Sequence, residues 1–137
     1  MPPEPVYFPE PVYFIDRSIA SQRVLDALRQ AGAAFVRHDD QFAQDTPDTV
    51  WLAEAGRRGW VVLTMDQRIR YNRLEREALL GNHVGAFIMV AKNLSGAQTA
   101  ACLVAALPTL RDFVARTPLP FIAKLYADGR LERLSLT

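Results

Sequence analysis

Six aspartates lie near the ends of apolar segments of this sequence, where several carboxylates could share one metal ion. Asp16 directly follows the apolar run 12–15, and Asp66 lies two residues beyond the run 60–64. Between these two runs come Asp39, Asp40, Asp45 and Asp48. Two ionised carboxylates ~4 Å apart repel by about 4 kcal/mol at an effective dielectric of 20. Several carboxylates in one cleft therefore require a bound proton or a cation.

Oxygen ligands of this kind favour a particular metal and a particular reaction. Carboxylates without a paired His or Cys favour Mg²⁺ or Mn²⁺ over zinc. A cation held by a few carboxylates and water suits the hydrolysis of a phosphodiester, because it activates water and stabilises the leaving oxygen. The acids also have structural interpretations, since Asp16 and Asp66 could cap helices and Asp48 could favour a helix dipole. It is their convergence that favours a metal site.

Arginines are concentrated around the last of these acids. Six arginines lie between residues 57 and 76, against only two acids in the same stretch. Arg68, Arg70 and Arg73 come just after Asp66 and are expected to contact the phosphates of a nucleic-acid backbone without reading its sequence. The alternative is a solvated helix face with local ion pairs such as Arg73–Glu77.

Four largely apolar runs predict the strands of a parallel sheet, because a strand covered on both faces shows no alternation. These runs are 12–15, 33–37, 60–64 and 85–90. Two further runs, 121–126 and 131–134, flank Asp128-Gly129 and predict a β-hairpin. Strands that alternate with helices predict an α/β fold with helices on both faces of the sheet.

Start and stop residues delimit the helices between these strands. Ser18 is expected to cap the first helix, which ends at Gly32, and Thr46 with Pro47 begins the second, which ends at Gly59. Residues 38–45 are expected to form a loop, and 66–80 to be mostly helical. Ser95 caps a long final helix, which Pro108 should kink or divide.

The topology of such a sheet determines where the acids lie. Right-handed crossovers bring the carboxyl ends of all parallel strands to one edge, and ligands bind at that edge where the strand order reverses. Asp16, Asp48 and Asp66 are therefore expected to gather there.

The N-terminus contains a direct repeat: the hexapeptide PEPVYF occupies residues 3–8 and again 9–14. Pro9 and Pro11 cannot donate to a sheet ladder, so the first strand is expected to begin after them. Residues 1–11 are interpreted as a lead-in, and 12–137 as a single domain that includes a C-terminal hairpin over 120–134.

The composition is that of one globular domain, with 137 residues, of which 50% are hydrophobic and 23% charged. The net charge of +1 does not by itself indicate a partner. A single cysteine, Cys102, excludes an internal disulfide. No segment has the pattern of a signal peptide or the ~18 apolar residues of a membrane span, so a cytoplasmic protein without a membrane partner is expected.

Three segments of the sequence resemble PIN-like domains, similar to the VapC-type toxin ribonucleases of bacterial toxin–antitoxin pairs. They are FID at 14–16, DTPDTVW at 45–51 and WVVLTMD at 60–66. The resemblance covers roughly residues 12–116, and the trailing hairpin resembles that of one PIN-like subgroup. It implies a three-layer α/β/α fold with a mainly parallel sheet in the order 2-1-3-4. It further implies a Mg²⁺-dependent endoribonuclease acting on RNA, often a homodimer, that a cognate antitoxin silences.

The resemblance also implies roles for individual residues. Asp16, Asp48 and Asp66 would be the metal-binding acids, and Thr64 would hold a carboxylate or a water in place. The long acid-rich loop before the second helix departs from the family pattern, so Asp40 or Asp45 could replace Asp48 as the second ligand. A fourth acid is not assigned.

A non-catalytic doubly wound module, either a receiver-like domain or a protein-binding scaffold, is the alternative function. Receivers require an acid pair after the first strand and a lysine after the last. Here Asp16 is followed by Arg17, and Lys124 falls within the predicted hairpin. These differences disfavour a receiver.

Overall fold

The computed structural model describes residues 10–91 and 93–136, so the first copy of the hexapeptide lies outside the described residues. The strands are β1 Tyr13–Ile15, β2 Phe35–Arg37, β3 Val61–Thr64, β4 Gly85–Met89, β5 Phe121–Leu125 and β6 Leu131–Arg133. They form one six-stranded sheet in the order β2-β1-β3-β4-β5-β6. All neighbouring strands pair in parallel except β5 and β6, which are antiparallel.

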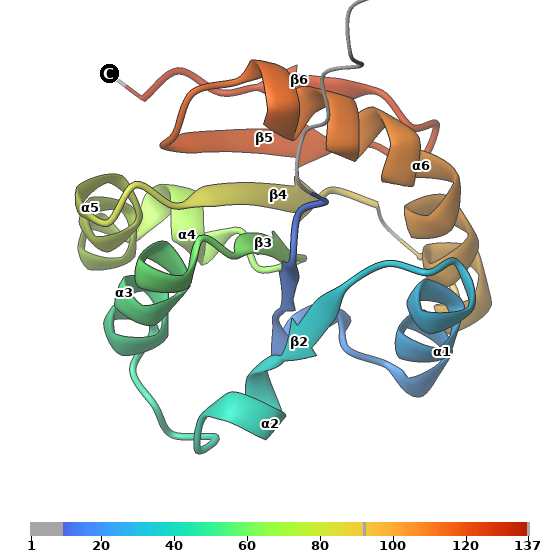
Figure 1. Ribbon diagram of the computed structural model, residues 1–137, viewed down its shortest axis with the longest axis horizontal. Helices are drawn as coiled ribbons and strands as arrows, with labels where there is room; N and C mark the ends of the chain where they lie inside the picture. Colours follow the sequence, from blue (N-terminus) through green and yellow to red (C-terminus); the bar gives the residue numbers. More distant parts are fainter. Residues whose placement is uncertain (1–9, 92, 137) are drawn as a thin grey trace, which may run out of the picture.

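Helices cover both faces of the sheet. They are the short 3₁₀ helix η1 Arg17–Ile19, then α1 Gln22–Gln30, α2 His38–Gln41, α3 Asp48–Arg58, α4 Arg68–Tyr71, α5 Arg73–Gly81 and α6 Gly96–Arg116. Figure 1 shows α1 and α6 on one side of the sheet and α3 and α5 on the other. The predicted three-layer α/β fold is confirmed. The order 2-1-3-4 is confirmed for the first four strands, and the hairpin extends the same sheet because β5 pairs with β4.

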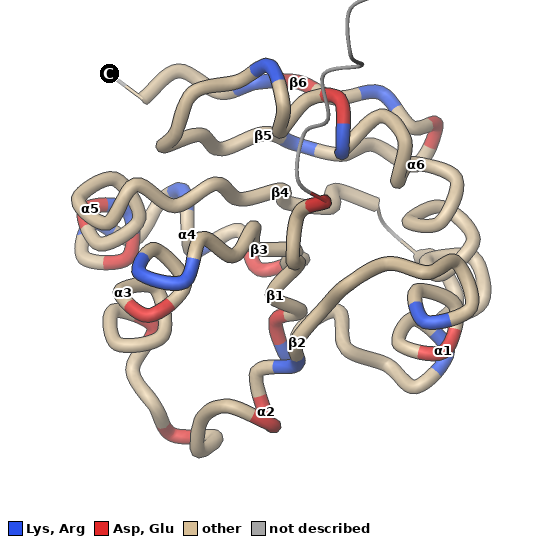
Figure 2. Tube along the Cα trace, in the orientation of Figure 1, with Lys and Arg blue, Asp and Glu red and all other residues tan. Residues whose placement is uncertain are grey.

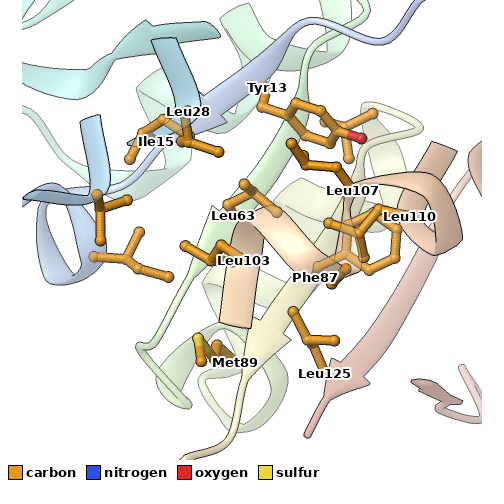
Figure 3. Close-up of a cluster of buried hydrophobic side chains, with 14 of the residues drawn as sticks. Tyr13, Ile15, Leu28, Leu63, Phe87, Met89, Leu103, Leu107, Leu110 and Leu125 are labelled. Carbon is orange, nitrogen blue, oxygen red and sulfur yellow. The ribbon is translucent and has the colours of Figure 1, made fainter. Parts of the chain in front are cut away.

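The core has two halves, because successive residues of each strand face opposite sides of the sheet. On the α1 and α6 side, Tyr13, Ile15 and Leu63 pack against leucines of the two helices (Figure 3). On the other side, Phe14 stacks between Trp51 and Trp60, with ring centroids 5.0 and 5.5 Å away. Burial on both faces explains why the strand sequences are apolar without alternation.

The helix starts differ from the sequence prediction at two places. Ser21, and not Ser18, caps α1, because its side chain accepts a hydrogen bond from the Val24 amide. Ser18 instead lies in η1, a 3₁₀ turn that Asp16 caps and that moves the start of α1 along the chain. Thr46 does not cap α3: its N-cap residue is Pro47, without a side-chain hydrogen bond.

The remaining helical segments mostly agree with the prediction. Gly32 and Gly59, with φ of 77° and 71°, adopt the left-handed conformation expected after α1 and α3. Ser95 forms a capping box with Gln98, and α6 continues through Pro108 without dividing. The predicted loop 38–45 begins with the short helix α2, whose first turn contains Asp39 and Asp40, acids that the N-terminal end of a helix dipole favours. The ring of His38 in this helix is buried beside Phe14. No helix of the described residues is long and apolar enough to cross a membrane.

Candidate functional site

Asp16 lies one residue beyond β1, at the carboxyl edge of the sheet. Its amide donates to the carbonyl oxygen of Leu63 at 3.0 Å, so the backbone is still held against β3. Its Oδ2 accepts hydrogen bonds from the Ser18 hydroxyl at 2.6 Å, the Thr64 hydroxyl at 2.8 Å and the Ser18 amide at 3.3 Å. All three bonds go to one oxygen, which leaves Oδ1 without a hydrogen bond from the described residues.

The Thr64 hydroxyl connects the ends of β1 and β3. While it donates to Asp16 Oδ2, its Oγ1 accepts from the Asp66 amide at 2.9 Å. The Thr64 side chain is buried, and the paired strands place Ile15 opposite Leu63, so the two strand ends are in register. One hydroxyl therefore fixes the carboxylate of Asp16 and the backbone of Asp66 relative to each other.

Asp66 is neutralised by Arg68. The Arg68 side chain donates from Nε to Oδ1 at 3.1 Å and to Oδ2 at 3.0 Å, and from Nη2 to Oδ2 at 2.7 Å. The Arg68 amide adds a hydrogen bond to Oδ1 at 2.9 Å. These hydrogen bonds lower the pKa of Asp66 and raise that of Arg68. The guanidinium thus supplies the positive charge that the Asp66 carboxylate requires.

A pair of carboxyl groups lies between α3 and α5. Asp48 is in the first turn of α3, and its Oδ1 accepts a hydrogen bond from the indole of Trp51 at 2.7 Å. Glu75 is in the first turn of α5. The pKa of Glu75 is raised to about 7 by burial, by a hydrogen bond with the Asp48 carboxyl and by the negative charges of Asp48 and Asp66. The positive charge of Arg68 acts on this pKa in the opposite direction. The same interactions place Asp48, Asp66, Arg68 and Glu75 in one electrostatic cluster.

Glu75 was not among the predicted site residues. It follows Asn72, whose side chain accepts a hydrogen bond from the Glu75 amide and caps α5. This capping pattern is visible in the sequence and places Glu75 in a first helical turn. Its proximity to Asp48 depends on how α5 packs against α3, which the sequence pattern does not specify.

The alternative second ligands lie elsewhere. Asp40 pairs with Arg37, with bonds of 2.6 and 2.9 Å, and Asp45 lies in the turn before α3. Neither is among the groups that act on the Glu75 carboxyl. Among residues 10–91 and 93–136, no three side chains of His, Cys, Asp or Glu are close enough together to enclose a metal ion.

The arginines expected to bind phosphate differ in their surroundings. Arg68 is bound to Asp66, and Arg73 forms the local pair with Glu77, 2.9 Å between Nε and Oε1, that the alternative interpretation predicts. The Arg70 guanidinium lies 4.6 Å from the centroid of the Tyr71 ring. Figure 2 shows that acidic and basic positions are mixed along α3 and α5 and do not segregate.

The chemistry of these residues fits a hard divalent cation. Every donor is a carboxylate or a hydroxyl oxygen, the type that Mg²⁺ and Mn²⁺ prefer. Two features indicate excess negative charge: Arg68 is bound to both oxygens of Asp66, and the Glu75 carboxyl beside Asp48 retains its proton up to near-neutral pH. A cation at this edge would relieve both, once Arg68 has moved from Asp66.

Comparison with known proteins assigns the fold to a family. A family model described as a PIN-like domain matches residues 11–91, more than half of the chain. The match includes the first four strands of the sheet, together with Asp16, Asp48, Asp66 and Glu75. No curated protein is significantly similar to the chain. PIN-like domains are commonly nucleases. The chain belongs to the family of PIN-like domains.

Proposed function

We propose that this protein is a Mg²⁺- or Mn²⁺-dependent endoribonuclease and the toxin of a toxin–antitoxin pair. The observation that carries the proposal is the hydrogen-bonded link Asp16–Thr64–Asp66 at the carboxyl edge of β1 and β3, within a PIN-like chain. The Asp48–Glu75 pair lies in the same electrostatic cluster as Asp66. On this proposal Asp16, Asp48 and Asp66 hold the cation.

The residues of the chain would prepare the site for hydrolysis in distinct ways. Ser18 and Thr64 hold Asp16 through Oδ2, so that Oδ1 is the oxygen left for the cation. Arg68 would leave Asp66 when the cation binds, and its guanidinium could then hold a phosphate of the RNA. A bound divalent cation supplies the activation of water and the stabilisation of the leaving oxygen.

A cleavage assay tests this function. Purified protein is incubated with a structured RNA and Mg²⁺, with and without EDTA, and compared with Asp16→Asn. Asp26→Asn is the matched control, because Asp26 is an exposed acid on α1 that pairs with Arg29. We expect cleavage by the wild type and by Asp26→Asn, and its loss with EDTA or with Asp16→Asn. Cleavage that survives both EDTA and Asp16→Asn would contradict the proposal.

The toxin assignment has its own test. Induced expression of the chain in a bacterial host is expected to arrest growth, while Asp16→Asn is expected to be tolerated. A small reading frame beside the gene should encode a protein that binds the chain and restores growth. If the chain cleaves RNA but its high expression leaves growth unimpaired, the toxin role is contradicted and the nuclease activity is not.

A non-catalytic binding module is the second candidate. The observation that favours it is that Asp66 is already neutralised by Arg68 in the structure. Calorimetry with Mn²⁺ separates the two candidates, because the nuclease requires a bound cation. Absence of a binding signal at millimolar Mn²⁺ would favour the binding module.

A further inference from the structure

Next to the candidate site, the chain exposes an aromatic side chain that the proposed mechanism does not use. Tyr71, at the end of α4, is 70% exposed, and Leu74, at the start of α5, is 67% exposed. Most other large apolar side chains of the described residues are buried or half-buried. Both side chains are therefore accessible to a ligand beside the candidate site.

The short helix α4 connects this ring to the candidate site. Ile69 is buried and anchors the helix to the core. Arg68 and Tyr71 are three residues apart, a spacing that places two side chains on the same side of a helix. The rise between them is about 4.5 Å. Since the Arg68 guanidinium is bound to Asp66, the short helix α4 carries both the exposed ring and a side chain of the candidate site.

A positively charged arginine side chain contacts this ring. The Arg70 guanidinium lies 4.6 Å from the ring centroid of Tyr71 in a cation–π contact. Arg70 forms no ion pair with any residue of the described ranges, so its charge remains available to a ligand. An aromatic face with a neighbouring arginine is the combination that single-strand-binding proteins use to stack a base and hold its phosphate.

We propose that Tyr71, together with Arg70, is a base-stacking platform that binds an unpaired base of single-stranded RNA beside the candidate site. The inference rests on the proposed function and gives its substrate class. The bases of a duplex are already stacked on each other and present no free face, so the platform would select unpaired RNA.

A protein partner could also cover this surface, but the charges favour RNA. The segment 68–76 that carries the ring contains Arg68, Arg70, Arg73 and Arg76, and neither Arg70 nor Arg76 forms an ion pair within the described residues. With four arginines against one acid, Glu75, this segment carries an excess of positive charge that complements the phosphates of RNA. Docking of a protein on Tyr71 is therefore treated as an outcome of the test.

Binding measured without cleavage tests the platform directly. The probe is a fluorescein-labelled oligoadenylate of about 12 nucleotides, within the site sizes of single-strand binders. Its anisotropy is titrated with protein in the Asp16→Asn background, so that no RNA is cut. Tyr71→Ala is expected to weaken binding about five- to a hundredfold, whereas Tyr71→Phe stays within about twofold of Tyr71. Tyr71→Leu, which keeps an apolar side chain without the ring, should behave like Tyr71→Ala.

The controls separate stacking from charge and from folding. Tyr126→Ala is the matched variant, because Arg130 lies 4.1 Å from the Tyr126 ring beyond β5, two strands away from β3. It should bind like the Asp16→Asn parent. An abasic strand with the same number of phosphates should bind equally well to the Asp16→Asn parent and to its Tyr71→Ala variant. Thermal melting should be unchanged in all Tyr71 variants, since the side chain is exposed.

Several results would overturn the platform. One is an equal affinity of the Asp16→Asn parent and its Tyr71→Ala variant for the oligoadenylate. Another is a loss of affinity in Tyr71→Phe as large as that in Tyr71→Ala. The third is an affinity of the parent for the abasic strand that equals its affinity for the oligoadenylate. A change of oligomeric state in Tyr71→Ala without loss of RNA affinity would assign the surface to a protein contact. A failure of the proposed function gives a different result. RNA binding that depends on Tyr71, together with no RNA cleavage by the wild type, would contradict the nuclease and not the platform.

Discussion

At the scale of single residues, the hydroxyl of Thr64 has the largest structural consequence for the site. It is buried, and it bonds both the Asp16 carboxylate and the Asp66 amide. A buried polar group that loses its partner costs about 1–3 kcal/mol. The position of the two acids relative to each other therefore depends in part on a side chain that is not itself an acid.

Thr64→Val, which removes the hydroxyl and keeps the shape, tests this dependence. We expect unfolding free energy to fall by about 1–3 kcal/mol, because Asp16 Oδ2 and the Asp66 amide each lose a partner. RNA cleavage should fall about ten- to a hundredfold, as when an outer-shell partner of a metal ligand is removed. Denaturant unfolding and the cleavage assay measure the two effects. Thr64→Ser, which keeps the hydroxyl, should restore activity, and its failure to do so would contradict the assigned contact.

Arg68 and a cation require the same carboxylate, so they should compete for Asp66. Removal of the guanidinium in Arg68→Gln is expected to tighten Mn²⁺ binding about two- to fivefold, the worth of an exposed ion pair. Calorimetry without RNA measures this change. Arg73→Gln, which breaks the exposed pair with Glu77 on the next helix, serves as the control and should bind Mn²⁺ like the wild type. Weaker Mn²⁺ binding by Arg68→Gln would show that the arginine supports the site.

The Glu75 carboxyl should make stability depend on pH. Its pKa is raised to about 7 in the folded protein, above the ordinary value near 4.5, so the folded state holds its proton more tightly than the unfolded state. The stability that this proton binding contributes to the folded state is complete below about pH 4.5 and is lost as the pH rises through about 7. In metal-free buffer, Glu75→Gln should flatten the fall in melting temperature between about pH 5 and 8. Identical slopes for the two proteins would contradict the Asp48–Glu75 contact.

At the scale of elements, the strands could be predicted from sequence and some helix starts could not. Apolar runs as short as 60–64 favour strands covered on both faces, because a buried helix is normally longer. Ser18 and Ser21 are equally plausible caps in sequence, and the choice depends on the 3₁₀ turn that Asp16 and Thr64 stabilise. A residue-level contact between distant segments thus decides a local boundary.

The residues of the candidate site, like the helix starts, could be predicted only in part from the sequence. Asp16 and Asp66 follow strands, so topology alone brings them to one edge of the sheet. Glu75 escaped prediction, because its approach to Asp48 depends on the packing of α5 against α3. The bond between Arg68 and Asp66 was not predicted either, since the short helix α4 turns the arginine back to an acid two residues earlier.

The contact between α3 and α5 can be tested at a glycine. A Cβ on Gly56 would lie 2.9 Å from Asn82 Cβ and still closer to the Asn82 carbonyl oxygen, which is backbone and has little freedom to move. Gly56→Ala is expected to destabilise the protein by about 1–3 kcal/mol through overpacking. By separating the helices it should also lower the raised pKa of Glu75.

Gly81, the last residue of α5, provides the control for this substitution. A Cβ there meets no atom within 4 Å, so Gly81→Ala should be neutral or stabilise the helix by up to about 1 kcal/mol. Denaturant unfolding of both variants makes the comparison. Equal effects of the two substitutions would contradict the close approach of α3 to the end of α5.

At the scale of the whole molecule, the sheet order explains why the acids converge. The chain passes from β1 to the neighbouring β2 on one side and then returns to β3 on the other side of β1. Crossovers of opposite direction place the switch point of the strand order between β1 and β3, which lie side by side in Figure 1, and Asp16 and Asp66 follow these two strands. The candidate site is thus a consequence of topology, while the charges of Arg68 and Glu75 would determine how strongly it attracts the proposed cation.

The central claim is that Asp16, Asp48 and Asp66 bind one divalent cation, and anomalous diffraction from crystals soaked in Mn²⁺ tests it most directly. The account predicts a single anomalous peak about 2.0–2.5 Å from carboxylate oxygens of all three residues, with Arg68 turned away from Asp66. A peak held by other side chains, or none at millimolar Mn²⁺ with the Arg68–Asp66 pair intact, would contradict it.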